Sequence, residues 1–308
     1  MPGMWNQHTL ETKIRNMNVM KYLLILLIFS SLLFSSKVEF EILGSGGPEL
    51  DGRASTSYLL WIDDEAKLLV DMGSGSMLRF EQSNAKLETL EATVLTHLHI
   101  DHSVDLPAFV KAGFFSSRSE PLEVIAPGGN KFFPSINEFL EDLFGKSGAY
   151  RYMNDVLSAH SDSFQIIPYE IKSTSIITKK YKDFTLKLID VHHGIVPALA
   201  LRIDVGSKSI VISGDTNDEN GNLEKIAKNA DLFIAHHAIP EHAGKFAKSL
   251  HMTPSVIANV AKKAHVKKIV LTHRMNRTFK HEQESLIIIK KDFKGKVIFA
   301  EDRMRLKL

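Results

Sequence analysis

The chain has 308 residues, of which 44% are apolar and 24% are charged, which is typical of a globular protein. This composition excludes a disordered, collagen-like or multi-span membrane chain, and the length allows one large domain or two small ones. The absence of cysteine excludes disulfides, thiolate metal sites, iron–sulfur clusters and a cysteine nucleophile, whereas 14 histidines leave a histidine and carboxylate metal site open.

The N-terminal segment is interpreted as an export leader. Residues 22–34 (YLLILLIFSSLLF) form an apolar run that follows Lys13, Arg15 and Lys21 in the chain. This run is too short to span a bilayer comfortably. We therefore assign residues 1–36 to a signal peptide with an upstream extension, or to an uncleaved N-terminal anchor. Either form predicts an exported protein, periplasmic or membrane-anchored.

The remaining residues, 37–308, are electrically balanced, with 35 basic and 35 acidic side chains. Lysine clusters within residues 179–182, 262–268 and 290–296 are interleaved with apolar residues, which is typical of a solvated face. Composition therefore does not favour nucleic acid as a partner.

Strands and helices alternate along residues 37–308 without a linker or repeat, which predicts a single layered α/β domain. A capping box at Ser135 and Glu138 predicts a helix that Gly145 ends, and Thr253 followed by Pro254 predicts the start of the last helix. Runs rich in β-formers predict the strands. These cover residues 38–43, 57–62, 67–70, 93–96, 184–191, 198–204, 209–213, 232–235 and 268–272.

The strongest chemical signal is the heptapeptide of residues 96–102 (THLHIDH), which follows a predicted strand. Alternate residues of an extended stretch share one face, so His97 and His99 can bind one ion. Asp101 and His102, at the following turn, can reach a second ion. This density of ligands favours a site for two divalent ions over a polar loop with chance histidines.

Residues 97–102 match the HxHxDH signature of the metallo-β-lactamase superfamily, and the chain resembles that family over residues 38–308. Other family motifs stand in order along the chain. They are LVDMG at Asp71, VHHG at His192 and His193, SGDT at Asp215 and LTH at His273. The resemblance implies an α/β fold, the four-layered αββα sandwich, with residues 37–308 as a hydrolase domain.

The resemblance also implies two divalent metal ions, with Zn²⁺ favoured and Mn²⁺ or iron as alternatives. The first ion would be bound by His97, His99 and His193, the second by Asp101, His102 and His273, and both by Asp215. His193 is favoured over its neighbour because a Gly-Ile segment follows it, as after the family ligand. Four residues are expected to support the ligands without binding an ion: Asp71, His192, His236 and His237.

Hydrolysis is the reaction that such a site implies. Two ions about 3.5 to 4 Å apart lower the pKa of a bridging water, so that hydroxide can attack the substrate near neutral pH. Asp215, where some β-lactamases have cysteine, argues against β-lactam hydrolysis. The spacing onward to His251 resembles the tRNase Z and sulfatase-like branch, in which a loop histidine assists the leaving oxygen. The predicted catalytic residues are Asp101 and His251, and His251 would act as general acid or transition-state stabiliser. The alternative for His251 is an exposed residue before a helix.

Two features differ from a tRNA-processing member of this branch. The family segment His-Glu-Ala reads here as His236-His237-Ala238, so an acidic partner for His251 would have to come from elsewhere, such as Glu241. Residues 132–157 are aromatic and partly acidic where a tRNA processor has a Gly-, Pro- and Lys-rich arm. Residues 109–157 are interpreted as a helical insertion that forms a lid, or as ordinary core packing, with six aromatic residues: Phe114, Phe115, Phe132, Phe133, Tyr150 and Tyr152.

The sequence therefore predicts a metal-dependent hydrolase of small phosphodiester or sulfate-ester substrates. The alternatives are a ribonuclease Z-type endonuclease that processes tRNA 3′ ends, and a non-catalytic metal-binding protein of the same fold. Nucleic acid is the less favoured partner. The sequence leaves the oligomeric state open, and a homodimer is compatible with the apolar residues of the insertion.

Overall fold

A computed structural model of the chain describes residues 15, 21, 36–161 and 163–308. The predicted leader lies almost wholly outside these residues, so export stays a prediction. Lys37–Leu308 forms one compact unit. In the part of the chain that the structure describes, every helix is too short or too polar to cross a bilayer.

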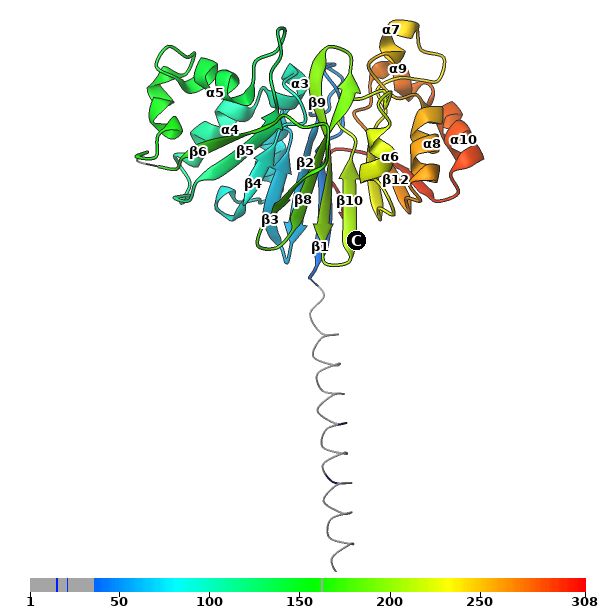
Figure 1. Cartoon of the computed structure of the whole chain (residues 1–308), viewed down its shortest axis with the longest axis horizontal. Helices are drawn as coiled ribbons and strands as arrows, with labels where there is room; N and C mark the ends of the chain where they lie inside the picture. Colours follow the sequence, from blue (N-terminus) through cyan, green and yellow to red (C-terminus); the bar gives the residue numbers. More distant parts are fainter. Residues whose placement is uncertain (1–14, 16–20, 22–35, 162) are drawn as a thin grey trace, which may run out of the picture. The chain divides into compact units, whose positions relative to one another are not determined.

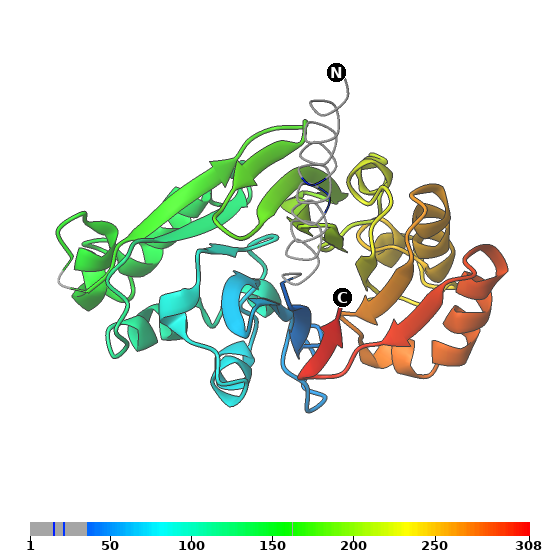
Figure 2. The ribbon, with the colours of Figure 1, turned by 90° about the horizontal axis from the view of Figure 1, so that it is seen from below.

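Two mixed sheets form the centre of this unit. In spatial order, the strands of the first sheet are β14 (Met304–Lys307), β1 (Val38–Gly44), β2 (Ser57–Ile62), β3 (Glu65–Val70), β4 (Ala92–Val94), β5 (Leu122–Pro127) and β6 (Ile166–Ile171). Those of the second are β13 (Lys296–Phe299), β12 (Lys268–Thr272), β11 (Leu232–His236), β10 (Lys208–Ile212), β9 (Val196–Val205), β8 (Thr185–His193) and β7 (Ile177–Lys180). The C-terminal β14 pairs antiparallel with β1 and closes the edge of the first sheet (Figure 2).

Helices cover the outer face of each sheet (Figure 1). The core between the sheets contains Phe40, Leu60, Leu188 and Leu201. The outer face of the first sheet packs against α2 (Ser76–Gln82), α4 (Leu106–Gly113) and α5 (Ile136–Phe144), and that of the second against α6 (Asn222–Ile226), α8 (Pro254–Lys263) and α10 (Glu282–Asp292). Shorter helices are η1 (Leu87–Thr89), α3 (Ile100–Ser103), η2 (Arg151–Leu157), α7 (Lys245–Lys248) and α9 (Asn276–Phe279). The predicted four-layered αββα sandwich is therefore confirmed.

The prediction that the helix after Thr253 is the last one is wrong, since α9 and α10 follow it. The apolar run of α10 gives little periodic signal, because Ile289 is buried while Ile287 is 53% exposed. Ser285, a polar residue, is buried on the same helix. The start of α8 at Pro254 agrees with the prediction, because the proline occupies the first helical position.

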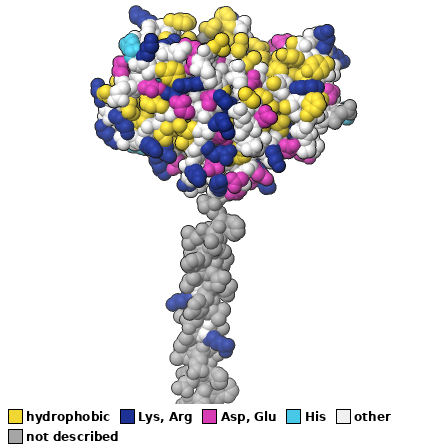
Figure 3. All heavy atoms as spheres, turned by 180° about the vertical axis from the view of Figure 1, so that it is seen from behind, with side chains coloured by type: hydrophobic (Ala, Val, Ile, Leu, Met, Phe, Trp, Pro, Cys, Tyr) yellow, Lys and Arg dark blue, Asp and Glu magenta, His cyan; other side chains and the backbone are white. Residues whose placement is uncertain are grey.

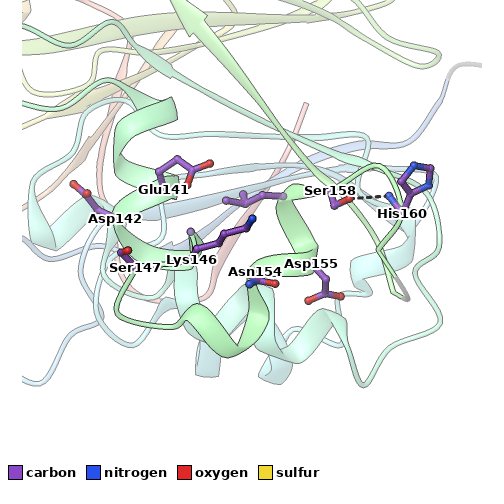
Figure 4. Close-up of a pocket in the computed structure, with 10 residues that line it drawn as sticks. Glu141, Asp142, Lys146, Ser147, Asn154, Asp155, Ser158 and His160 are labelled. Carbon is purple, nitrogen blue, oxygen red and sulfur yellow. Dashed lines mark hydrogen bonds between the residues drawn. The ribbon is translucent and has the colours of Figure 1, made fainter.

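The prediction of one continuous insertion over residues 109–157 is also wrong. These residues include β5, which pairs in parallel with β4 and β6 inside the first sheet. Only α5 and η2, between β5 and β6, extend outward as a lobe (Figure 1). The lobe has a polar pocket of about 730 Å³, lined among others by Glu141, Asp142 and Lys146, and this pocket includes none of the predicted site residues (Figure 4).

The strand directions bring the signature motifs to one edge of the sandwich. β3 and β4 run parallel in the first sheet, and β10, β11 and β12 run parallel in the second. Because the carboxyl ends of parallel strands meet at one edge, the segments that follow these strands lie close together. The antiparallel β8 and β9 add the turn at His193.

Candidate metal centre

The predicted ligands converge on the buried carboxylate of Asp215. Its Oδ2 atom lies close to the Nε2 atoms of four imidazoles, at 4.0 Å from His97, 3.8 Å from His102, 3.7 Å from His193 and 3.4 Å from His273. His99 Nδ1 lies 3.0 Å from His97 Nε2, and Asp101 Oδ2 lies 3.2 Å from His273 Nε2. The structure thus brings together all the side chains that the sequence assigned to the ions; we call this set the cage.

Two groups of side chains have the spacing of metal ligands. In each, the ligand atoms lie within 4.8 Å of one another: His97, His99, His193 and Asp215 in one, and His102, Asp215, His236 and His273 in the other. The Nε2 atoms of His102, His193 and His273 are buried without a hydrogen-bond partner among the described residues. Buried polar atoms rarely stay unpartnered, and imidazole and carboxylate groups suit divalent metals such as zinc. The cage therefore fits a dinuclear site that shares Asp215.

Neighbouring groups orient the cage imidazoles. Asp71 Oδ2 accepts a hydrogen bond from His102 Nδ1 (2.8 Å), and Leu250 O accepts one from His193 Nδ1 (2.9 Å). Asp71 is itself held by Thr96, whose backbone N–H and hydroxyl donate to its two carboxylate oxygens at 2.7 and 2.8 Å. An imidazole that donates from one nitrogen keeps the lone pair of the other for a metal.

His236 orients Asp215 and is not itself free to bind an ion. Burial lowers the pKa of His236 to about 4, so the neutral ring carries one proton, on Nδ1 beside Asp215, and its Nε2 accepts a hydrogen bond from the Tyr58 hydroxyl at 2.8 Å. His236 Nδ1 then donates to Asp215 Oδ1 at 2.7 Å. Both ring nitrogens are used, and Asp215 Oδ2 remains directed at the cage. Sequence reasoning missed Tyr58 and Thr96, because a tyrosine in a buried strand and a threonine before the signature have no distinctive pattern.

The electrostatics of the cage suit cations. Burial, assisted by the His102 imidazole, holds the pKa of His97 well below its usual value, so this ring is neutral. Burial alone would raise the pKa of Asp215, but the surrounding imidazoles, led by His273, hold it well below its usual range. The two carboxylates Asp215 and Asp101 outweigh burial at His273 and raise its pKa well above the usual value. A divalent ion would compete with that proton for the same negative site.

The family model described as the Metallo-beta-lactamase superfamily matches residues 50–250 of the chain. The chain belongs to this superfamily. The matched residues include the HxHxDH segment, His193 and Asp215, whereas His251 and His273 follow the end of the match. Together with the cage, membership identifies a metallo-hydrolase.

The chain is similar to a curated ribonuclease Z and to solved structures of the same fold. The ribonuclease Z of Listeria welshimeri is 26% identical over 291 residues, covering 82% of this chain and 93% of the relative. The metallo-beta-lactamase fold protein YhfI of Bacillus subtilis has a TM-score of 0.71 at 20% identity, covering 89% of this chain and 100% of that one. The short form of human tRNase Z has a TM-score of 0.65 at 22% identity, covering 87% of this chain and 98% of that one.

His251 lies beside the cage. Its side chain is 11% exposed, which does not fit the alternative of an exposed residue before a helix, and its Nδ1 lies 3.7 Å from Asp215 Oδ2. The ring centroid lies 5.2 Å from that of His193. Burial lowers the pKa of His251 to about 3. A neutral ring can donate a hydrogen bond to a substrate oxygen, which favours transition-state stabilisation over proton donation.

Three supporting roles predicted from the sequence are contradicted by the structure. His192 points away from the cage, with its Nδ1 3.0 Å from Asn217 Oδ1. His237 is a core histidine whose Nε2 lies 3.0 Å from Ser285 Oγ, and burial lowers its pKa to about 4. Glu241 does not reach His251, because its carboxylate accepts from the backbone N–H (2.9 Å) and hydroxyl (2.7 Å) of Ser255 at the start of α8.

The aromatic residues predicted to form a lid have different surroundings. Phe133 packs edge-on against the cage, with its ring centroid 5.7 Å from that of His99. Phe114 packs against Phe164, and Tyr150 against Phe144. The core-packing alternative therefore holds for Phe114, whereas Phe133 packs against the cage.

Tyr58→Phe tests how Asp215 is held. We expect a loss of about 1–3 kcal/mol in the free energy of unfolding, because His236 Nε2 would be buried without a partner. Metal affinity should fall about tenfold or more, as it does when groups that orient ligands are removed. Denaturant titration and competition with a chromophoric chelator measure the two effects. The control is Tyr150→Phe, at a tyrosine on the lobe that is 39% exposed. An unchanged metal affinity in Tyr58→Phe would contradict the role of Tyr58 in holding Asp215 through His236.

Proposed function

We propose that the chain is a zinc-dependent phosphodiesterase that cleaves RNA in the manner of ribonuclease Z. The observation that carries the proposal is the position of His251, a histidine outside the ligand set whose Nδ1 lies 3.7 Å from the carboxylate that both ions would share. The relative from Listeria welshimeri, aligned over 82% of the chain, is named ribonuclease Z, which supports the same reaction.

The cage residues and His251 divide the work of phosphodiester hydrolysis. Two Zn²⁺ ions, when bound, would lower the pKa of a water molecule and polarise a phosphoryl oxygen. Asp101, whose side chain is 11% exposed, is held ionised against burial by the His102 and His273 imidazoles, so its carboxylate can accept a hydrogen bond from the attacking water and orient it. His251 donates an N–H hydrogen bond to the phosphoryl or leaving oxygen, on which negative charge develops.

The relatives differ from the sequence prediction in two substrate classes, sulfate esters and nucleic acid. Sulfate esters, part of the main prediction, find no support among the relatives. Nucleic acid, which composition did not favour, is now the proposed substrate, because the names of relatives such as the human tRNase Z point to RNA. Composition misses such a partner, since a few lysines near one site do not alter the charge balance of a whole domain.

A second candidate is hydrolysis of a small phosphodiester. The segment between β5 and β6 favours this candidate. Its only described helices are α5 and η2, whereas the resemblance to tRNA processors implied a long basic arm at this point of the chain. A compact lobe offers less surface for the body of a folded RNA.

Three substrates separate the candidates. We expect the zinc-loaded full chain to cut a hairpin RNA with a single-stranded 3′ extension, to hydrolyse bis(p-nitrophenyl) phosphate more slowly, and to leave an aryl sulfate intact. A chelator should abolish both activities, and Zn²⁺ or Mn²⁺ should restore them. Cleavage of the diester without cleavage of the RNA would favour the second candidate. A rate that the chelator does not change would contradict a metal-dependent hydrolase.

A further inference from the structure

Three surface segments surround the mouth of the cage. Phe132 is 57% exposed, Ile195 in the turn between β8 and β9 is 60% exposed, and Phe246 on α7 is 80% exposed. Each segment is tied to the cage or to His251 beside it: Phe133 packs on the cage residue His99, and Ile195 follows the cage residue His193 by two positions in the chain. The α7 segment contacts His251, whose backbone N–H donates to Ala247 O at 3.0 Å. We call the exposed residues of these segments the rim: Lys131, Phe132, Ile195, Lys245, Phe246 and Lys248.

One side chain holds two of the rim segments together. Asn130 Nδ2 donates to Ile195 O at 2.8 Å, while its Oδ1 accepts from the backbone N–H groups of Phe132 and Phe133 at 2.8 and 3.0 Å. The turn is also fixed on its other side, because His193 Nδ1 donates to Leu250 O. The rim is therefore pre-organised, which lowers the entropy that a ligand loses on binding.

A hollow of about 360 Å³ lies between the first two segments. It is lined by Asn130, Lys131, Phe132 and residues 194–197, so it begins next to the cage residue His193. The hydrogen-bonding atoms of the Asn130 amide are largely used internally, which leaves Phe132, Ile195 and the Lys131 ammonium to contact a ligand. Aromatic and aliphatic walls beside one cation fit a planar ring attached to an anion.

Each phenylalanine of the rim has lysine close to it in sequence. Lys131 Nζ lies 4.7 Å from the centroid of the Phe132 ring, and Lys245 and Lys248 are exposed on the same short helix as Phe246. Figure 3 shows the back face of the molecule, on which hydrophobic and basic side chains are interspersed with acidic ones. Aromatic platforms flanked by cations are the usual means of binding single-stranded nucleic acid, because bases stack and phosphates pair with lysine.

We propose that the rim binds the single-stranded RNA on either side of the scissile phosphate, with bases stacked on Phe132 and Phe246 and phosphates paired with the three lysines. This inference rests on the proposed function, because it assumes an RNA substrate, but it concerns how that RNA is held. A small phosphodiester would reach the cage without engaging α7.

Phe132→Ala and Phe246→Ala in the zinc-loaded full chain test the rim, with the RNA hairpin bearing a single-stranded 3′ extension as substrate. Each variant should raise KM for this RNA by about five- to tenfold, whereas kcat should change much less. Lys245→Gln with Lys248→Gln should make the negative slope of log affinity against log salt shallower by about 1.4. Phe115→Ala, at a phenylalanine that is 82% exposed outside the rim, is the matched control and should leave KM unchanged.

The outcomes separate this inference from the proposed function. If the wild-type chain cuts RNA and both rim variants match the Phe115→Ala control in KM, the rim proposal is overturned while RNA cleavage stands. If the rim variants convert a dimer into a monomer in sedimentation and leave KM unchanged, the rim is a self-association face and the proposal is also overturned. If the wild-type chain cuts no RNA but hydrolyses bis(p-nitrophenyl) phosphate, both proposals fail.

Discussion

Asp215→Asn is expected to lower the rate of hydrolysis by about a thousandfold and to reduce the bound zinc from two equivalents to less than one. Its Oδ2 lies within 4.0 Å of Nε2 atoms in both ligand groups, so the change removes the negative charge that the two ions would share. Removing one partner from a set of buried charges costs about 4 kcal/mol, which corresponds to about a thousandfold in affinity.

Zinc content by elemental analysis and steady-state kinetics on bis(p-nitrophenyl) phosphate check this expectation. Glu219→Gln makes the same chemical change at a side chain that is 69% exposed and close in sequence, so it should keep both ions and most of the activity. Two equivalents of tightly bound zinc in Asp215→Asn would contradict the shared role of this carboxylate.

Much of the fold follows from local signals in the sequence. The predicted strands at Ser57–Ile62 and Lys268–Thr272 coincide with β2 and β12, because β-rich residues lie between clear turn residues. The predicted ligand set came instead from the order of motifs that the chain shares with the metallo-β-lactamase superfamily. The structure shows why these motifs meet, because several of them directly follow parallel strands that end at one edge of the sandwich.

The supporting residues needed three-dimensional information. His236 ends β11 and faces the cage, whereas the next residue, His237, faces α10 and Ser285, as the alternation of side chains along an extended chain requires. Motif comparison treats both as equal neighbours of the site. Glu241 was named only as one acidic residue that could pair with His251. Its carboxylate instead accepts from the backbone N–H of Ser255, which has no partner within the helix at the start of α8.

The boundary of the insertion also needed the sheet. β5 consists of a short apolar run, Leu122–Pro127, in a stretch rich in aromatic residues, and its assignment depends on pairing with β4 on one side and β6 on the other. Short apolar runs of this kind do not distinguish a buried strand from a helix. The aromatic content of the whole stretch therefore suggested one lid where the structure has a sheet strand and a separate lobe.

His251→Ala is expected to lower kcat by about a hundredfold or more while both zinc ions stay bound. The imidazole lies at the mouth of the cage without being required by either ligand group, so its loss should remove hydrogen bonding to the transition state and leave the metal affinity unchanged. His192→Ala is the matched control, because this histidine is adjacent to a ligand in sequence yet contacts Asn217 outside the cage. The control should keep its rate within about twofold. Loss of zinc in His251→Ala would make this residue a ligand, and an unchanged kcat would leave the hydrolysis to the cage alone.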